Sequence, residues 1–147
     1  RTRLAAALGL VHRLPDQARG NCDLVFHASG NPAGLVRALE LAGQDATVVE
    51  MSWYGRRSAE LPLGAAFHAR RLRLQSSQVG RLPPPRSPRW DYRRRMELAL
   101  ALLVDPRLDA LISGETDFTD LPALMQRLAE APAGALCERI RYASPST

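Results

Sequence analysis

The sequence predicts an α/β fold with a parallel sheet, and three observations support this prediction. An apolar run at residues 24–26, in a strand predicted at 24–28, is followed by a turn of small residues at 28–30, and Asn31-Pro32 then begins a helix. Asn is a favoured N-cap, and Pro fits the first helical position because the amide hydrogen that it lacks would go unused there. A second strand, with β-branched residues, is expected at 46–51. Strand, helix and strand in this order form a right-handed parallel crossover.

The other elements are predicted by periodicity and by Gly, Pro and Asp signals at their ends. In the first half of the chain we expect the end of a helix at 2–8, a short strand at 10–14, a helix at 32–42 with Gly43 as its C-cap, a short helix at 64–71 and an edge strand at 72–79. In the second half we expect a proline-rich loop at 82–88, a helix from Pro88 to about residue 104 capped by Ser87, a strand at 108–113, a helix at 121–131 with Asp120 as a candidate cap, and a strand at 136–142.

Length and composition are those of a globular protein. The 147 residues suffice for one domain with a core, and 46% of them are apolar. No run approaches the roughly 20 apolar residues of a membrane span, and the N-terminus lacks the hydrophobic region of a signal peptide. We therefore expect no membrane partner and a cytoplasmic protein, in which Cys22 and Cys137 are reduced and packed. Because no initiator Met is present, the chain is expected to begin inside a longer protein.

The basic residues are unusual in kind and in distribution. All 20 of them are Arg, which excludes a Schiff-base lysine and a Walker phosphate loop, since both need the amine. Residues 56–95 hold 11 Arg against two acidic residues, whereas the remainder holds nine Arg against 13 acidic residues. A basic segment of this kind attracts phosphates. Nucleic acid is nevertheless a poor candidate partner, because aromatic residues make up only 5% of the chain and no nucleic-acid motif is present.

Candidate chemistry lies at the end of the first predicted strand. In open parallel sheets, ligands bind beyond the carboxyl ends of the strands, so the turn from Ala28 to Asn31 is the first place to expect a site. None of the three histidines belongs to a recognisable nucleophile–base constellation, and His27 is expected to be structural and hydrogen-bonded. Ser29 lacks the G-x-S-x-G pattern of a hydrolase elbow. The sequence therefore assigns no catalytic residue, and the cysteine spacing assigns no metal ligand.

Two further groups have competing interpretations. The aromatic pair Trp53-Tyr54 follows the second strand, where it would either wall a substrate pocket or pack as a hinge between domains. The acidic pair Glu115 and Asp117 is expected in a solvated turn and not in a carboxylate dyad.

Three segments together carry a family resemblance. The strand CDLVFHASG and its capped helix are similar to a fourth strand that one family writes as Asp, three hydrophobic residues, Glu-x-x-Gly. The strand ATVVEMSWYG is similar to the fifth strand of that family, and residues 108–142 are similar to its closing strand, helix and strand. With these segments the chain resembles the C-terminal half of medium-chain dehydrogenases/reductases, the zinc alcohol dehydrogenase-like superfamily.

This resemblance implies a partial Rossmann fold, a doubly wound parallel sheet that lacks its first strands. Residues 1–107 would form part of an NAD(P)-binding domain, and residues 108–147 would return toward an absent GroES-like catalytic domain. The implied function is that of the cofactor-binding portion of an oxidoreductase that moves hydride between an alcohol or carbonyl substrate and NAD or NADP. The isolated chain would be inactive, and any zinc would belong to the absent domain.

The resemblance also implies which residues contact the cofactor and the partner subunit. In relatives, sixth strands often pair edge to edge, which would make a homodimer through Leu72 to Gln75. The implied cofactor-binding residues are Arg1 and Arg3 near the adenosine, Ala28, Ser29 and Gly30 near the ribose and adenine, Val49, Glu50 and Met51 near the nicotinamide, and Ser77 and Gln78 after the sixth strand.

The chain also departs from the family's pattern. His27 stands where many relatives carry Glu, and Glu50 stands where many carry Gly. We therefore expect the Glu50 carboxylate to point away from the nicotinamide or to make a specific polar contact. The family's G-x-G-x-x-G fingerprint does not occur, and the first two strands of the sheet are missing. Leu24 and Phe26 should consequently lie on an exposed apolar edge.

Two other functions remain open from the sequence. The chain would serve as a non-catalytic, degenerate Rossmann module that binds a partner protein, or residues 56–95 would bind nucleic acid through their arginines. Salt dependence would identify the second, because phosphate neutralisation depends steeply on salt.

Overall fold

The computed structural model describes residues 1–130 and 134–143. The chain divides into two compact units, one of residues 13–91 and one of residues 1–12 together with the chain from Tyr92 onward. This division falls before the predicted domain boundary at 107/108, and the assignment of 1–107 to a cofactor domain stays a prediction. Across the described residues, every helix is too short or too polar to cross a bilayer.

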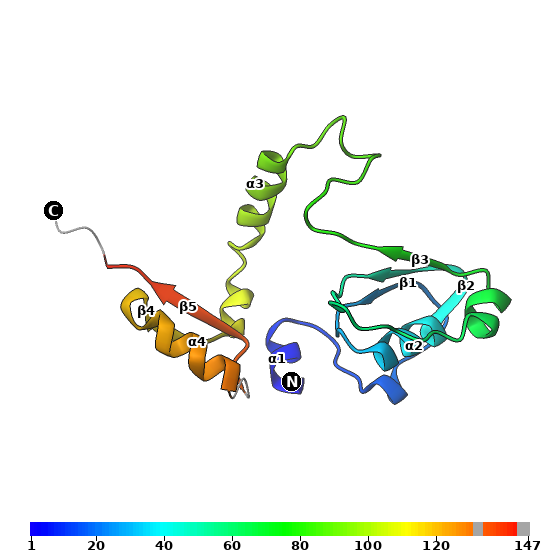
Figure 1. Ribbon diagram of the computed structural model, residues 1–147, viewed down its shortest axis with the longest axis horizontal. Coiled ribbons are helices and arrows are strands. Elements are labelled where there is room, and N and C mark those ends of the chain that lie inside the picture. The colour runs from blue at the N-terminus through cyan, green and yellow to red at the C-terminus, as the bar shows by residue number, and fades with distance from the viewer. Residues whose placement is uncertain (131–133, 144–147) are drawn as a thin grey trace. The chain divides into compact units, whose positions relative to one another are not determined.

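The unit of residues 13–91 contains a three-stranded parallel sheet (Figure 1). Its strands are β1 (Cys22–His27), β2 (Ala42–Glu50) and β3 (Arg73–Ser76), and their order in the sheet is β1-β2-β3. His27 pairs with Glu50, and Glu50 pairs with Ser76, so the three carboxyl ends are aligned. The predicted α/β class with parallel strands is confirmed.

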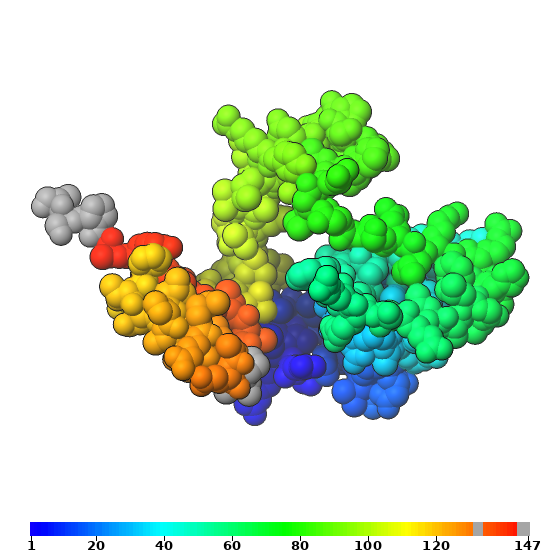
Figure 2. Space-filling model, viewed as in Figure 1, coloured from blue at the N-terminus to red at the C-terminus, as the bar shows by residue number. Residues whose placement is uncertain are grey.

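Helix α2 (Pro32–Leu41) connects β1 to β2 and packs on one face of the sheet. The predicted cap is confirmed, because Asn31 Oδ1 accepts a hydrogen bond from the Ala33 amide at 3.0 Å. The core lies between helix and sheet. Figure 2 shows the outer face of this part of the chain, coloured cyan to green. The buried core residues are Leu35, Ala38, Leu39, Ala42, Ala46, Val48 and Leu72.

The opposite face of β1 is exposed. Side chains alternate along a strand, so Val25 and His27 face α2 while Leu24 and Phe26 face away from it. Leu24 is 50% exposed and Phe26 is 63% exposed. Since β1 is also an edge of the sheet that the described residues form, the predicted apolar edge is confirmed.

Three predictions in this unit are wrong or incomplete. Residues 10–14 form no strand, and a 3₁₀ turn (Pro15–Gln17) follows them. Gly43 is not the C-cap of α2, because the helix ends at Leu41, its C-cap is Ala42 and the chain runs directly into β2. A Cβ at Gly43 would meet Asn21 Oδ1 at 2.7 Å, so close approach and not capping requires this glycine. The helix predicted at 64–71 is a distorted turn (Leu63–Phe67), in which Ala65 departs from helical geometry, continuing through His68.

The other unit contains α1 (Thr2–Ala7), α3 (Tyr92–Leu102), α4 (Leu121–Glu130) and the parallel pair β4 (Ile112–Asp117) and β5 (Cys137–Arg141). The predicted order of strand, helix and strand after residue 108 is confirmed, although Ala131 lies outside the described residues. The predicted start of α3 is wrong. Ser87 does not cap it, because its hydroxyl donates to the Pro84 carbonyl, and the helix begins only at Tyr92.

The strand predicted at 108–113 begins later than expected. A 3₁₀ turn (Pro106–Leu111) precedes it, and Asp105 caps this turn by accepting from the Arg107 amide at 3.0 Å. The acidic pair Glu115 and Asp117 therefore lies in β4 and not in a turn. Glu115 forms an ion pair with Arg139, and Asp117 forms one with Arg141, both across to β5. The expected solvated turn is therefore wrong, and the two acidic residues belong to ion pairs between neighbouring strands.

Candidate functional site

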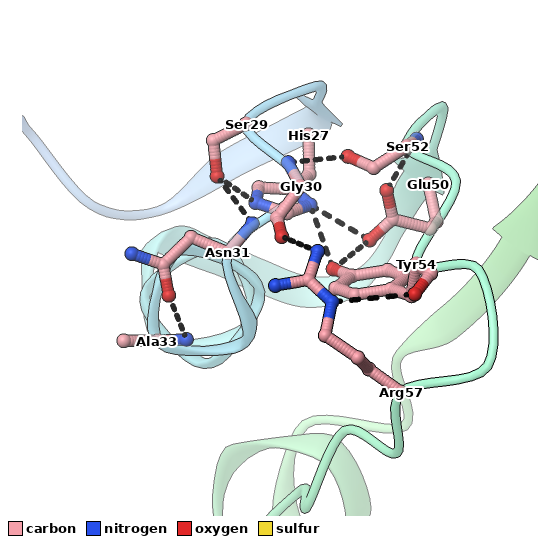
Figure 3. A network of polar contacts seen from close by, with 9 residues as sticks. All are labelled: His27, Ser29, Gly30, Asn31, Ala33, Glu50, Ser52, Tyr54 and Arg57. Atoms are coloured by element: carbon pink, nitrogen blue, oxygen red, sulfur yellow. Dashed lines mark hydrogen bonds and ion pairs between the residues drawn. The ribbon is translucent and has the colours of Figure 1, made fainter. Parts of the chain in front are cut away.

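The carboxyl ends of β1 and β2 hold a cluster of polar side chains, the β1–β2 network, which comprises His27, Ser29, Glu50, Ser52 and Tyr54 (Figure 3). The parallel register produces it, because His27 and Glu50 are paired residues that end neighbouring strands. The ladder continues past the strand ends. The Met51 amide donates to the His27 carbonyl at 2.8 Å, and the Ser77 amide donates to the Glu50 carbonyl at 2.8 Å.

His27 is the centre of this network. Its side chain is only 6% exposed, and both ring nitrogens have partners. Nδ1 lies 2.7 Å from Glu50 Oε2, and Nε2 lies 2.7 Å from Ser29 Oγ. A carboxylate accepts hydrogen bonds only, so Glu50 fixes the tautomer in which Nδ1 carries the proton and Nε2 accepts from the Ser29 hydroxyl.

Glu50 is held ionised by its hydrogen bonds. Burial acts to raise the pKa of this carboxyl, but hydrogen bonds from Ser52, His27 and Tyr54 outweigh burial and lower the pKa below its usual value. Oε1 accepts from the Ser52 amide at 2.6 Å, and Oε2 accepts from the Tyr54 hydroxyl at 2.9 Å. The pKa of Tyr54 is raised, first by burial and then by its hydrogen bond to Glu50 and the negative charge there.

The turn between β1 and α2 is braced from two sides. Gly30 has a φ of +65°, which a side chain would strain, and its amide donates to Ser52 Oγ at 3.0 Å. Arg57 donates from its guanidinium to the Gly30 carbonyl at 3.4 Å (Figure 3). A Cβ at Gly30 would meet no atom within 4 Å, so the surface beside the turn is open.

The first turn of α2 approaches the network closely. A Cβ at Gly34 would lie 2.6 Å from Ser29 Oγ and 2.8 Å from His27 Nε2. Real Cβ atoms do not approach other atoms this closely, so the network can form only because position 34 has no side chain. Nothing in the sequence pattern singled out this glycine.

The structure brings most of the predicted cofactor residues to one edge of the sheet. Ala28 and Ser29 are exposed, Gly30 is half-buried, Val49 and Glu50 are half-buried at the end of β2, and Met51 is 52% exposed. Ser77 and Gln78 follow β3 and are exposed. Arg1 and Arg3 lie in the other compact unit, so their relation to this edge stays a prediction.

Sequence reasoning missed part of the network. The expectation that His27 is hydrogen-bonded is confirmed, but its partners Ser29 and Glu50 were not foreseen. That the chain has no catalytic histidine stays a prediction. The expected polar contact of Glu50 is confirmed. Tyr54 packs against the core and bonds Glu50, whereas Trp53 is 89% exposed, so the two aromatic residues have different surroundings. Among the described residues, no three His, Cys, Asp or Glu side chains gather as metal ligands would.

Comparison with known proteins gives a likeness in fold. No family model and no curated protein matches the chain. Among solved structures, alcohol dehydrogenase TADH from Thermus sp. ATN1 is 21% identical with a TM-score of 0.66, over 95% of this chain and 41% of that one. L-idonate 5-dehydrogenase from Escherichia coli str. K-12 substr. MG1655 is 24% identical with a TM-score of 0.61, over 86% of this chain and 33% of that one.

A third likeness is to 2R,3R-butanediol dehydrogenase from Bacillus subtilis, at 14% identity and a TM-score of 0.61, over 95% of this chain and 34% of that one. The chain thus spans about a third to two fifths of the length of these structures. The resemblance drawn from the sequence is confirmed at the level of fold: the chain has the α/β architecture with parallel strands of a portion of these dehydrogenase structures.

Proposed function

We propose that the chain is the C-terminal, cofactor-binding portion of a zinc-type, NAD(P)-dependent alcohol dehydrogenase-like oxidoreductase. The observation that supports this most strongly is the order of elements. The strands β1, β2 and β3 form a parallel sheet, α2 connects β1 to β2, and an open turn follows β1. The likeness to an alcohol dehydrogenase over 95% of the chain agrees with it. A complete enzyme of this kind transfers hydride between the nicotinamide ring and an alcohol or carbonyl carbon.

In this proposal the turn after β1 is one wall of the cofactor cleft. Ala28, Ser29 and Gly30 lie at the carboxyl end of the sheet, where open α/β sheets bind ligands. The exposed side of the turn is open to a ligand, since a Cβ built at Gly30 would meet no atom within 4 Å. The residues present therefore fit the approach of a nucleotide along this edge.

The nicotinamide side is assigned to the end of β2. Val49 and Met51 present apolar surface there, and Met51 is 52% exposed. The Glu50 carboxylate is turned into the β1–β2 network, where it accepts from His27 and Tyr54. Its side chain is thereby kept out of the space of the nicotinamide ring, as a larger residue at this position requires.

The remaining assignments complete the proposal. Ser77 and Gln78 would follow the cofactor past β3, and Arg1 or Arg3 would contact its adenosine. No zinc ligand is assigned to this chain. Leu72 to Gln75 would pair with a second copy along the β3 edge.

Cofactor binding by the complete protein that carries this segment tests the proposal. Ala28→Trp would place an indole on the exposed turn and should weaken NADH or NADPH binding by roughly tenfold, or about 1.4 kcal/mol. Gln44→Trp is the matched control, because Gln44 is also exposed but lies at the start of β2. Equal affinities of the two variants would contradict the assignment of this edge.

The isolated chain provides a second test. Without the fingerprint turn it should bind neither NAD(H) nor NADP(H) usefully, and micromolar affinity would contradict the proposal that it is only one wall of the cleft. If the complete protein binds no nicotinamide cofactor, the non-catalytic interaction module becomes the better explanation.

A further inference from the structure

Ser29, His27 and Glu50 have the connectivity of a serine nucleophile with its base and its orienting carboxylate. Such sites are recognised by geometry: the nucleophile and the base lie within hydrogen-bond reach, and a third group orients the base. Here Ser29 Oγ lies 2.7 Å from His27 Nε2, and His27 Nδ1 lies 2.7 Å from Glu50 Oε2 (Figure 3). We propose that Ser29 is a nucleophile that accepts the acyl group of small carboxylic esters, with His27 as its general base and Glu50 as the positioning residue.

The environment of each member suits this role. Ser29 is exposed and accessible to an ester, whereas His27 is 6% exposed and Glu50 is 12% exposed. The carboxylate is fixed by the Ser52 amide at 2.6 Å and by the Tyr54 hydroxyl at 2.9 Å, so it cannot rotate away from the imidazole. The ionised Glu50 would stabilise the imidazolium that forms when His27 takes the serine proton.

Ser29 is also presented as nucleophiles usually are, on a tight turn between a strand and a helix. The Asn31 amide donates to Ser29 Oγ at 3.2 Å, which orients one lone pair of the hydroxyl and leaves its hydrogen for His27. Asn31 itself caps α2 through Oδ1. The positive end of the α2 dipole, which begins at this turn, would stabilise a developing oxyanion.

The close approach of α2 supports a preorganised site. Gly34 leaves just enough room for the Ser29–His27 hydrogen bond, since a Cβ there would lie within 3 Å of both partner atoms. The absence of a side chain at position 34 therefore leaves the space in which the Ser29 hydroxyl reaches the imidazole.

The reaction balances without a cofactor. Ser29 Oγ bonds to the ester carbonyl carbon while its proton passes to His27 Nε2. The bond from that carbon to the alcohol oxygen then breaks, and the leaving alkoxide takes the proton from His27. Water repeats the sequence on the acyl-serine, which releases the carboxylic acid and restores Ser29 and His27.

A fluorophosphonate probe tests the proposal on the 147-residue chain, with no nicotinamide cofactor in the assay. The expected result is covalent labelling located at Ser29 by peptide mass spectrometry, together with release of nitrophenol from p-nitrophenyl acetate. Ser29→Ala should abolish both, whereas Ser87→Ala should change neither, because Ser87 is an exposed serine whose hydroxyl donates to the Pro84 carbonyl, outside the β1–β2 network. Labelling at other serines but not at Ser29 in the folded chain would overturn the proposal.

The roles of His27 and Glu50 are tested by rate. His27→Gln should slow labelling by roughly 100-fold, the contribution expected of a general base. Glu50→Gln should also slow labelling. The ring ¹⁵N resonances of His27 should then show loss of the Nδ1-protonated tautomer, a change that a purely structural role of Glu50 would not require. Unchanged rates in both variants would overturn the assignment. Because the assay needs no dinucleotide, its failure would leave the proposed dehydrogenase function unaffected.

Discussion

The substitution Gly34→Ala has a predictable cost because two opposing effects act at this position. In a helix, Ala is more favourable than Gly by at most about 1 kcal/mol. The new Cβ, however, would lie 2.6 Å from Ser29 Oγ and 2.8 Å from His27 Nε2. His27 cannot withdraw, since it is 6% exposed and is held by Glu50, so Ser29 must leave the imidazole.

The magnitude follows from the bond that is lost. A hydrogen bond contributes about 1 kcal/mol net, and a buried nitrogen left without a partner costs about 1–3 kcal/mol. Steric displacement thus outweighs helix propensity, and we expect Gly34→Ala to lower the free energy of unfolding by about 1–2 kcal/mol, or the Tm by several degrees.

Thermal and urea unfolding followed by circular dichroism measure this change. Gly64→Ala is the matched control, because a Cβ at Gly64 would meet no atom within 4 Å, and it should leave stability unchanged or raise it slightly. In a Ser29→Ala background the closest clash disappears, so the cost of Gly34→Ala should shrink. If Gly34→Ala equals or exceeds the unmodified chain in stability, the close packing of α2 against the network is refuted.

Three further predictions concern the same unit. Asn31→Ala should destabilise α2 by about 1 kcal/mol, because the Ala33 amide loses the side-chain oxygen that caps it. The midpoint of urea unfolding should fall, and an unchanged midpoint would show that the cap does not contribute to stability. The pKa of the Glu50 carboxyl is lowered in the folded chain, so the carboxylate contributes stability above the ordinary pKa of 4.5, and this stability is lost as the pH falls through the folded pKa. Glu50→Gln should therefore flatten the acid side of a plot of unfolding free energy against pH. A change in unfolding free energy that is the same at every pH would contradict this. Phe26→Lys should reduce aggregation, measured by light scattering, and should change the free energy of unfolding by no more than about 0.5 kcal/mol, because Phe26 is 63% exposed on an edge strand. If the variant aggregates as much as the unmodified chain, this edge does not self-associate.

Local signals predicted the elements around the site well. The Asn31 cap and the apolar run before it are read from neighbouring residues, and both are found in the structure. The wrong predictions involve competition that the sequence pattern does not display. Ser87 is a residue type that often caps a helix, but its hydroxyl donates to the carbonyl of Pro84, three residues earlier in the chain. Gly43 follows a helix as a C-cap would, but the chain passes straight into β2 beside Asn21.

The site itself depends on strand register, which explains why the sequence predicted only half of it. His27 and Ser29 are neighbours in the chain, whereas Glu50 reaches them only because β1 and β2 pair in parallel with His27 opposite Glu50. A shift of one residue would turn the Glu50 side chain to the other face of the sheet. Gly34 and Tyr54 join the cluster through packing, and no spacing rule in the sequence links them to His27.

The register also joins the two positions at which the sequence departs from the pattern of the family that it resembles. His27 and Glu50 are paired residues of neighbouring strands, and their side chains lie 2.7 Å apart. Glu50 beside a Glu at position 27 would place two carboxylates together in a half-buried site, which raises the free energy of both charged forms. His27 without Glu50 would leave a buried imidazole nitrogen without its acceptor. Each side chain therefore supplies the hydrogen-bond partner that the other needs, and the pair places an imidazole beside an ionised carboxylate at this edge of the sheet.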